Sequence, residues 1–209
     1  RSTLFPYTTL FRSGRRLVVI DVQRGGPSTG MPTKSEQADL MQALYGRNGE
    51  SPVVVLAAST PTDCFDMAYW AGKLAVEHMT PVILLTDAFI ANGSAAWRIP
   101  DYLNDYPEIR PNYVENYRNP EPWKAYRRDK NTLVRYWAVP GTEGFTHRIG
   151  GLEKDYDTSS ISTDPRNHQK MVQTRQGKID KIADYIPDVE VLGDRSEEHT
   201  SELQSRSAI

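Results

Sequence analysis

One stretch of the sequence, DVQRGGPSTGMPT at residues 21–33, combines a single arginine with residues that build tight turns. Arg24 carries a planar fork of N–H donors that suits a carboxylate or a phosphate. The glycines around it, Gly25, Gly26 and Gly30, allow a close approach of the backbone. Thr33 would add a hydroxyl group at the start of a helix, where backbone N–H groups attract anions. The residue types indicate an anion site built from a guanidinium, a hydroxyl and free amides.

The spacing of this motif leaves two interpretations open. It matches neither the dinucleotide fingerprint GxGxxG nor the phosphate loop GxxxxGK[ST], because Lys34 lacks the preceding glycine. An arginine that anchors a structural turn is the competing explanation. Ligand binding requires Arg24 and Thr33 to converge on one partly exposed spot. A salt bridge from Arg24 to Asp21 or Glu36 would favour the structural turn.

Three apolar runs rich in β-branched residues are spaced like the strands of an α/β sheet. They are LVVIDV from Leu17, VVVLAAS from Val53 and PVILLTDAF from Pro81. Continuous apolar character is expected of strands that are buried on both faces. With helices between them, the order is βαβαβ, which implies parallel strands and right-handed crossovers. Ligands of such sheets bind beyond the carboxyl ends of the strands, where residues 21–33 lie.

Helical spacing predicts two crossover helices. The first covers residues 34–44, with Thr33 as its N-cap and Glu36 completing a capping box. The second covers residues 62–78, and its predicted inward face consists of Phe65, Ala68, Tyr69, Gly72, Ala75 and Val76.

The second half of the chain has a different character. Residues 94–163 are rich in proline, tyrosine and tryptophan and show no long periodic run, so we expect an ordered excursion that packs on a neighbour or covers a site. From Asp164 a helix is predicted, with proline at its first position and Pro187 at its end. Its expected apolar stripe consists of Met171, Val172, Ile179, Ile182 and Ile186.

The two ends of the sequence differ from the rest. Reverse translation of residues 3–13 and 195–205 can give the sequences of common short-read sequencing adapters. We therefore expect residues 1–13 and 195–209 to be adapter-derived artefacts. Residues 14–194 would then be one partial α/β domain from the inside of a longer gene.

Composition excludes several classes of function. A formal net charge of −2 gives no reason to propose nucleic acid or a membrane surface as a partner, and the apolar runs are too short to span a bilayer. The single cysteine, Cys64, excludes an internal disulfide and a four-cysteine iron–sulfur or zinc site. His78, His147 and His168 lack metal-ligand spacing, so no metal site is predicted. A reducing, cytoplasmic setting is the default.

Beyond these patterns, three stretches resemble a known family. They are DVQRGGPSTGMPTKSEQADLMQALYGRNGESPVVVLAASTPTDCFDMAYWA, PVILLTDAFIANGSAAWRIPD and PGTEGFTHRIGGLEKD. Together they closely resemble the alpha subunit of 2-oxoacid:ferredoxin oxidoreductases, the 2-oxoglutarate type in particular, over essentially all of residues 14–194. The resemblance implies a partial doubly wound parallel sheet of the thiamine pyrimidine-binding type, followed by a long aromatic loop region.

The resemblance also implies a function. Such enzymes oxidatively decarboxylate a 2-oxoacid to acyl-CoA and pass the electrons to ferredoxin; 2-oxoglutarate, pyruvate and branched-chain 2-oxoacids stay open as substrates. Thiamine diphosphate and Mg²⁺ would be shared with a beta subunit, and the iron–sulfur cluster would belong to the complex but not to this segment. The threonine-bearing loop and the activating glutamate of the family would precede Gly14. We therefore expect no catalytic residue within the fragment and no activity from it alone.

Three residues receive substrate-binding roles from the resemblance. Arg24 would pair with the substrate carboxylate and Thr33 would hydrogen-bond it. In the loop HRIGGLEKD, Asp155 or Lys154 could select the distal group of the oxoacid. The alternative is a non-catalytic α/β interaction module, in which the arginine loop stabilises a turn and the aromatic region is a subunit interface.

Overall fold

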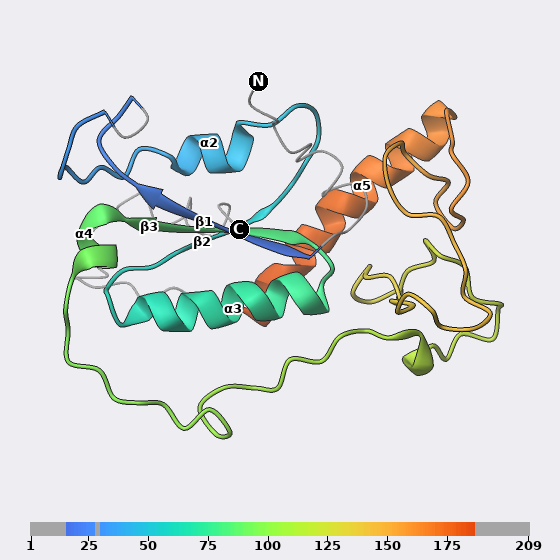
Figure 1. Ribbon diagram of the computed structural model, residues 1–209. Coiled ribbons are helices and arrows are strands. Elements are labelled where there is room, and N and C mark those ends of the chain that lie inside the picture. Colours follow the sequence, from blue (N-terminus) through green and yellow to red (C-terminus); the bar gives the residue numbers. More distant parts are fainter. Residues whose placement is uncertain (1–15, 28–29, 187–209) are drawn as a thin grey trace, which may run out of the picture.

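The computed structural model describes residues 16–27 and 30–186. The ends that we interpret as adapter-derived, residues 1–13 and 195–209, lie outside these ranges. The described residues contain a three-stranded parallel sheet in the order β1-β3-β2 (Figure 1). Its strands are β1 (Leu17–Gln23), β2 (Val54–Ala57) and β3 (Pro81–Asp87). The predicted parallel α/β sheet is confirmed.

The register of the sheet brings the carboxyl ends of the strands together. Along β1 and β3, Leu17 lies opposite Pro81 and Gln23 lies opposite Asp87. Strand β2 joins the other side of β3, with Ala57 opposite Leu85. The segment that carries Arg24 therefore leaves the sheet at the edge where ligands of parallel sheets bind.

Side chains alternate between the two faces of the sheet and enter two separate cores. One core lies against α3 (Asp63–Glu77) and α5 (Pro165–Ile182) and consists of Val54, Ala71, Leu74, Ala75, Val82, Leu84, Ile179 and Ile182. The other lies against the short helix α2 (Leu40–Tyr45) and consists of Ala43, Val53, Val55 and Leu85. Helices thus cover both faces (Figure 1).

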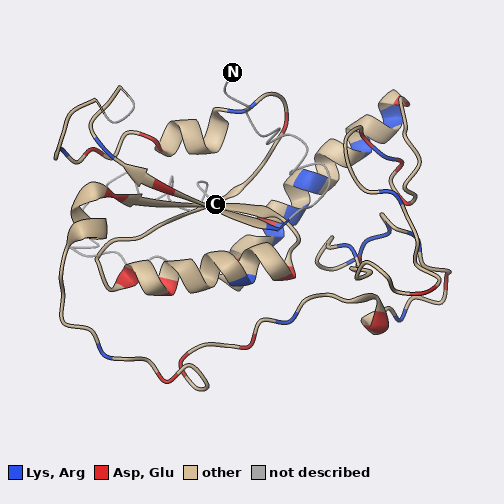
Figure 2. Cartoon of the chain, in the orientation of Figure 1, with Lys and Arg blue, Asp and Glu red and all other residues tan. Residues whose placement is uncertain are grey.

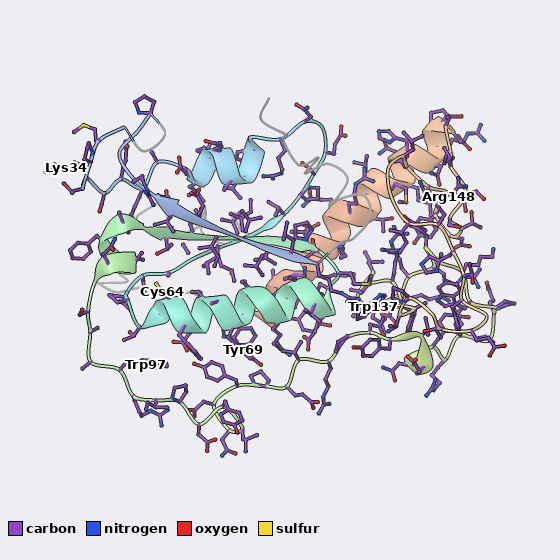
Figure 3. All side chains as sticks on the ribbon, viewed as in Figure 1. Lys34, Cys64, Tyr69, Trp97, Trp137 and Arg148 are labelled. Atoms are coloured by element: carbon purple, nitrogen blue, oxygen red, sulfur yellow. The ribbon has the colours of Figure 1, made fainter. Side chains whose placement is uncertain are left out.

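Helix α3 spans nearly the predicted range but turns a different face to the sheet. Its buried residues are Ala71, Leu74 and Ala75, so most of the predicted inward face was wrong. Phe65 and Tyr69 instead contact the aromatic excursion, with ring centroids 5.0 Å from Trp97 and 4.5 Å from Tyr106, respectively. The helix is apolar on two sides, because one packs on the sheet and the other on residues 97–106 (Figure 3).

The chain after β3 forms the short helix α4 (Ala88–Asn92) and then the long excursion. All of residues 94–163 are described, and they hold no strand or α-helix, only the 3₁₀ turn η1 (Val114–Asn116) and isolated bridges. The excursion ends at α5, where the Asp164 side chain accepts a 2.8 Å hydrogen bond from the Arg166 N–H, a normal N-cap.

Three predicted residues of the α5 stripe, Met171, Ile179 and Ile182, are buried. The helix ends at Ile182 and continues as the 3₁₀ turn η2 (Ala183–Tyr185); Pro187, the predicted end, lies outside the described residues. In the part of the chain that the structure describes, no helix is both long and apolar enough to cross a membrane.

Candidate functional site at the carboxyl edge of the sheet

The arginine motif forms a narrow loop closed by backbone hydrogen bonds. The Gly25 N–H donates to the Lys34 carbonyl at 2.9 Å, and the Met31 N–H donates to the Gly25 carbonyl at 3.2 Å. Arg24 and Thr33 directly precede Gly25 and Lys34, the two residues that the first of these bonds joins, so both belong to the same loop. Glycine is required at position 30, because a Cβ there would lie 2.8 Å from the Pro27 carbonyl oxygen.

The predicted helix start at Thr33 is wrong. Thr33 has φ 58°, in the left-handed region, and α2 begins only at Leu40 with Asp39 as its N-cap. Glu36 does not complete a capping box, because its Oε2 accepts a 3.1 Å hydrogen bond from the Gly26 N–H. The field of a helix end fades within its first turn, so α2 does not support an anion at Thr33.

The three glycine amides of the loop are described and are not free, contrary to the prediction. The N–H groups of Gly25, Gly26 and Gly30 donate to Lys34, Glu36 and Pro27, respectively. The loop uses its own donors to hold its shape. An anion at this place would be recognised by side chains, not by a cradle of backbone amides.

Arg24 itself is exposed and lacks the salt bridge that a structural turn would use. Its Nε donates to the Val22 carbonyl at 3.4 Å. Among the ion pairs of the described residues, none joins Arg24 to Asp21 or Glu36. Burial, with a smaller contribution from nearby Asp39, raises the pKa of Asp21. The guanidinium thus keeps donors available, and Thr33 in the same loop is also exposed.

A network of hydrogen bonds beneath the arginine loop, at the ends of β1 and β3, supports the loop. Gln23, 6% exposed, donates from Nε2 to the Thr86 carbonyl at 3.3 Å and accepts from the Asp39 N–H at 3.0 Å. Gln37 donates to Asp87 at 2.7 Å. These bonds join the ends of β1 and β3 to the segment between the loop and α2. No local signal in the sequence identified Gln37, because its partner is 50 residues away.

Asp87, at the end of β3, is the N-cap of α4. Its Oδ1 accepts from the N–H groups of Phe89 and Ile90 at 2.7 and 3.0 Å. The hydrogen bond from Gln37 is the first cause that lowers the pKa of Asp87, followed by the backbone bond from Ile90. The carboxylate is therefore ionised, and both of its oxygens accept hydrogen bonds from this chain.

Polar side chains also gather at the start of α3, near the carboxyl edge of the sheet. The sequence analysis did not identify this place as a site. Asp63 Oδ2 accepts from the N–H and the hydroxyl of Ser59 at 2.8 and 2.9 Å, and Cys64 Sγ lies 3.8 Å from Thr86 Oγ1. Beside it is a hollow of about 550 Å³, lined by Thr62, Asp66, Trp70, Ala96, Trp97, Arg98, Pro100, Asp105 and Tyr106. A hydrogen bond to Asp66 raises the pKa of Tyr106 to about 12.

The structure does not bring Asp155 together with Arg24 and Thr33. Asp155 lies in the excursion near the start of α5, where its Oδ1 accepts from the N–H groups of Asp157 and Thr158. Lys154 is buried and donates to the Gly150 and Leu152 carbonyls, both at 2.7 Å. Figure 3 shows Arg148 of this loop and Lys34 of the arginine loop at opposite ends of the molecule. Both Asp155 and Lys154 hold turns.

Residues 14–166 match the protein family described as pyruvate flavodoxin/ferredoxin oxidoreductase, thiamine diphosphate-binding. The chain is 58% identical over 175 residues to 2-oxoglutarate oxidoreductase subunit KorA of Mycobacterium tuberculosis, covering 84% of this chain and 26% of the relative. It is 49% identical over 168 residues to the 2-oxoacid:ferredoxin oxidoreductase subunit alpha of Saccharolobus solfataricus, covering 79% and 26% of the two chains.

A solved structure agrees with these relatives. It is 2-oxoglutarate:ferredoxin oxidoreductase from Magnetococcus marinus with 2-oxoglutarate, coenzyme A and succinyl-CoA bound, 32% identical with a TM-score of 0.81. The match covers 90% of this chain and 32% of that one, so the chain spans about a quarter to a third of the proteins named here. The fold, the match over residues 14–166 and the identities show that the chain belongs to the thiamine diphosphate-binding family of pyruvate flavodoxin/ferredoxin oxidoreductases.

Proposed function

We propose that this chain is part of the alpha subunit of a 2-oxoglutarate:ferredoxin oxidoreductase. The enzyme would oxidatively decarboxylate 2-oxoglutarate to an acyl-CoA and pass the electrons to ferredoxin. The names of the relatives support this reaction, and the Magnetococcus marinus structure, which has 2-oxoglutarate, coenzyme A and succinyl-CoA bound, supports the substrate and the product.

The observation that carries the proposal is the exposed guanidinium of Arg24 at the carboxyl edge of the sheet. It has no carboxylate partner among the described residues, and it belongs to the same hydrogen-bonded loop as Thr33. A guanidinium can bind a carboxylate through two parallel N–H donors. In this proposal Arg24 pairs with the substrate carboxylate and Thr33 hydrogen-bonds it. Asp155 is not included, because its carboxylate forms a turn far from this loop.

Thiamine diphosphate and Mg²⁺ would be held mainly outside the described residues. The carboxylates of Glu36, Asp63 and Asp87 at this edge already accept backbone N–H groups of this chain. The described residues therefore do not fit a complete cofactor site, and no step of the reaction is assigned to them through the cofactor. The remaining groups would come from other parts of the alpha subunit and from a beta subunit, and the iron–sulfur cluster from the rest of the complex.

The aromatic excursion supports assembly with other chains. Ile99, Tyr102 and Leu103 are 82%, 73% and 77% exposed, which is unusual for large apolar side chains. We assign this stretch to a subunit contact, with the beta subunit as the proposed partner. The proposal also includes ferredoxin as the electron acceptor, coenzyme A as the acyl acceptor and the cytoplasm as the location.

The proposed reaction can be tested with the longer alpha subunit that contains these residues, co-expressed with its beta subunit. Coenzyme-A-dependent reduction of a viologen dye is measured with 2-oxoglutarate, pyruvate and a branched-chain 2-oxoacid. The proposal predicts that 2-oxoglutarate has the highest kcat/KM. A clear preference for either of the other two substrates would contradict it. The 209-residue chain alone is expected to show no 2-oxoacid-dependent dye reduction in a single-turnover assay.

A further inference from the structure

A group of cationic side chains lies at the opposite edge of the sheet from Arg24. It consists of Arg16, Arg128, Arg135, Arg175 and Lys178, which we call the basic cluster. Arg16 directly precedes β1, and Lys178 donates a 3.1 Å hydrogen bond to the carbonyl of Met79, two residues before β3. The basic cluster is thus at the amino ends of the strands. Figure 2 shows the Lys and Arg positions along α5 and in the loops beside it.

Helix α5 and the excursion bring these side chains together. Met171, Arg175 and Lys178 are spaced at i, i+4 and i+7, so they share one face of the helix. Arg128 Nη2 lies 3.6 Å from Met171 Sδ, and Arg128 Nη1 donates to the Tyr156 carbonyl at 3.0 Å. A guanidinium from the excursion therefore packs on the cationic face of α5.

Aromatic rings hold the other two guanidinium groups. Arg135 is buried, and its Cζ lies 4.5 Å from the ring centroid of Tyr126. Arg16 Cζ lies 3.4 Å from the ring centroid of Trp137, a residue that Figure 3 shows close to the end of α3. Such stacking fixes the planes of the guanidinium groups without removing their charge.

Four members of the basic cluster have little negative charge beside them among the described residues. For Arg16, Arg128, Arg175 and Lys178, the described residues provide one ion pair, between Arg175 Nη1 and Glu153 at 3.4 Å. Glu153 is shared with His168. The Nε atoms of Arg16 and Arg175 are buried without a hydrogen-bond partner. Buried donors without acceptors destabilise a fold, and unpaired buried charges do so more strongly.

The electrostatics of Lys178 reflect this excess of positive charge. Burial, followed by the charges of Arg128, Arg135 and Arg175, lowers the pKa of Lys178 to about 7. The pKa of Arg128 is lowered to about 10, mainly by burial and by Arg135. Both side chains are nevertheless partly exposed to solvent. A small anion would meet the basic cluster where these two residues face solvent.

We propose that the basic cluster binds a phosphate-type oxyanion, either free phosphate or the phosphate group of a larger ester. Several guanidinium forks and one ammonium group match the multiple oxygens and the double charge of such an anion. A bound dianion would neutralise the excess charge. This site is separate from the proposed substrate site, because the two lie at opposite ends of the strands.

The test compares phosphate with chloride at equal ionic strength and pH, in the 209-residue chain and in the complex of the alpha and beta subunits. At phosphate concentrations tenfold above its dissociation constant, the midpoint of thermal unfolding should rise by about 3–6 °C. Lys178→Met and Arg175→Gln should each abolish most of this shift. Arg166→Gln, which removes an exposed cation from the first turn of the same helix, should retain it.

Two further measurements complete the test. Calorimetric titration of the wild-type protein with phosphate reports binding directly, even where a variant fails to fold. Titration with adenosine 3′,5′-bisphosphate distinguishes a phosphate ester from free phosphate as the ligand. Tighter binding than that of phosphate identifies an ester, and equal binding identifies the free anion. Equal unfolding midpoints in phosphate and chloride, with no saturable heat in the titration, would overturn the proposal. A phosphate shift of equal size in Lys178→Met and wild type would also overturn it.

Discussion

Gln37 and Asp87, 50 residues apart in the sequence, are joined by a 2.7 Å hydrogen bond at the carboxyl edge of the sheet. Asp87 ends the central strand and caps α4, while Gln37 lies shortly after Lys34, the residue that closes the arginine loop. This bond ties the loop to the most buried strand of the fold. The position of Arg24 therefore depends on β3 as well as on its own strand.

The first prediction concerns this bond. Gln37→Ala should lower the free energy of unfolding by about 1–3 kcal/mol, because a buried, ionised carboxylate loses a charge-assisted hydrogen bond. Urea unfolding of the chain measures the change. Gln173→Ala removes an exposed glutamine from α5 and should change the free energy by less than about 0.5 kcal/mol. Equal effects of the two substitutions would mean that the Gln37–Asp87 bond contributes nothing to stability.

The second prediction concerns the shape of the arginine loop. Gly30→Ala would place a Cβ 2.8 Å from the Pro27 carbonyl oxygen, so the loop must shift. In the complete oxidoreductase we expect this substitution to lower kcat/KM for 2-oxoglutarate by about tenfold or more, because misplacing a binding group weakens its contribution.

Gly72→Ala in α3 is the matched control for the loop variant. A Cβ at Gly72 meets no atom within 4 Å, and replacing a helical glycine by alanine should stabilise the fold by about 0.4–1 kcal/mol. Its kcat/KM should stay at the wild-type value. If Gly30→Ala also leaves kcat/KM unchanged, the shape of the loop does not matter for catalysis.

The third prediction concerns pH. His78 is 4% exposed, and its Nδ1 has no hydrogen-bond partner within the described structure. Burial, followed by the charge of Lys178, lowers the pKa of His78 from 6.5 to about 4. Because the unfolded chain binds this proton more tightly, the contribution of His78 to stability should rise between pH 4 and 6.5, by about 3 kcal/mol.

His78→Phe tests this pH dependence, because phenylalanine does not titrate and can keep the contact with the Tyr185 ring. The difference in unfolding free energy between wild type and variant, measured by urea titration at several pH values, should change over that range and level off above it. His168→Gln, at an exposed histidine, should preserve the rise. A constant difference between wild type and His78→Phe would contradict the assignment.

Local patterns predicted the strands but not the details that depend on distant contacts. Continuous apolar runs identified β1, β2 and β3, since strands buried on both faces need that character. The capping pattern at Thr33 and Glu36 failed because the bond between Gly25 and Lys34 closes the loop and draws Glu36 to Gly26. The inward face of α3 was misassigned because periodicity cannot distinguish a face that packs on a sheet from one that packs on an aromatic segment.

For the candidate site, the sequence predicted the position of Arg24 but not that of Asp155. The order of strand and loop is enough to place Arg24 at the carboxyl edge. The location of Asp155 follows from the path of an irregular excursion of about 70 residues, for which periodicity gives no information. The partners of Gln37 and the basic cluster likewise depend on contacts between residues far apart in the chain.

The central claim is that Arg24 recognises the carboxylate of the substrate. Its most direct test is kcat/KM for 2-oxoglutarate in the complete alpha–beta oxidoreductase, compared between wild type and Arg24→Lys, with Lys34→Arg as the control in the same loop. Lysine keeps the charge but loses the paired donors, so kcat/KM should fall by about tenfold to a hundredfold, while the control stays near wild type. Unchanged kinetics of a well-folded Arg24→Lys complex would show that the loop is scaffolding and that the substrate is held elsewhere.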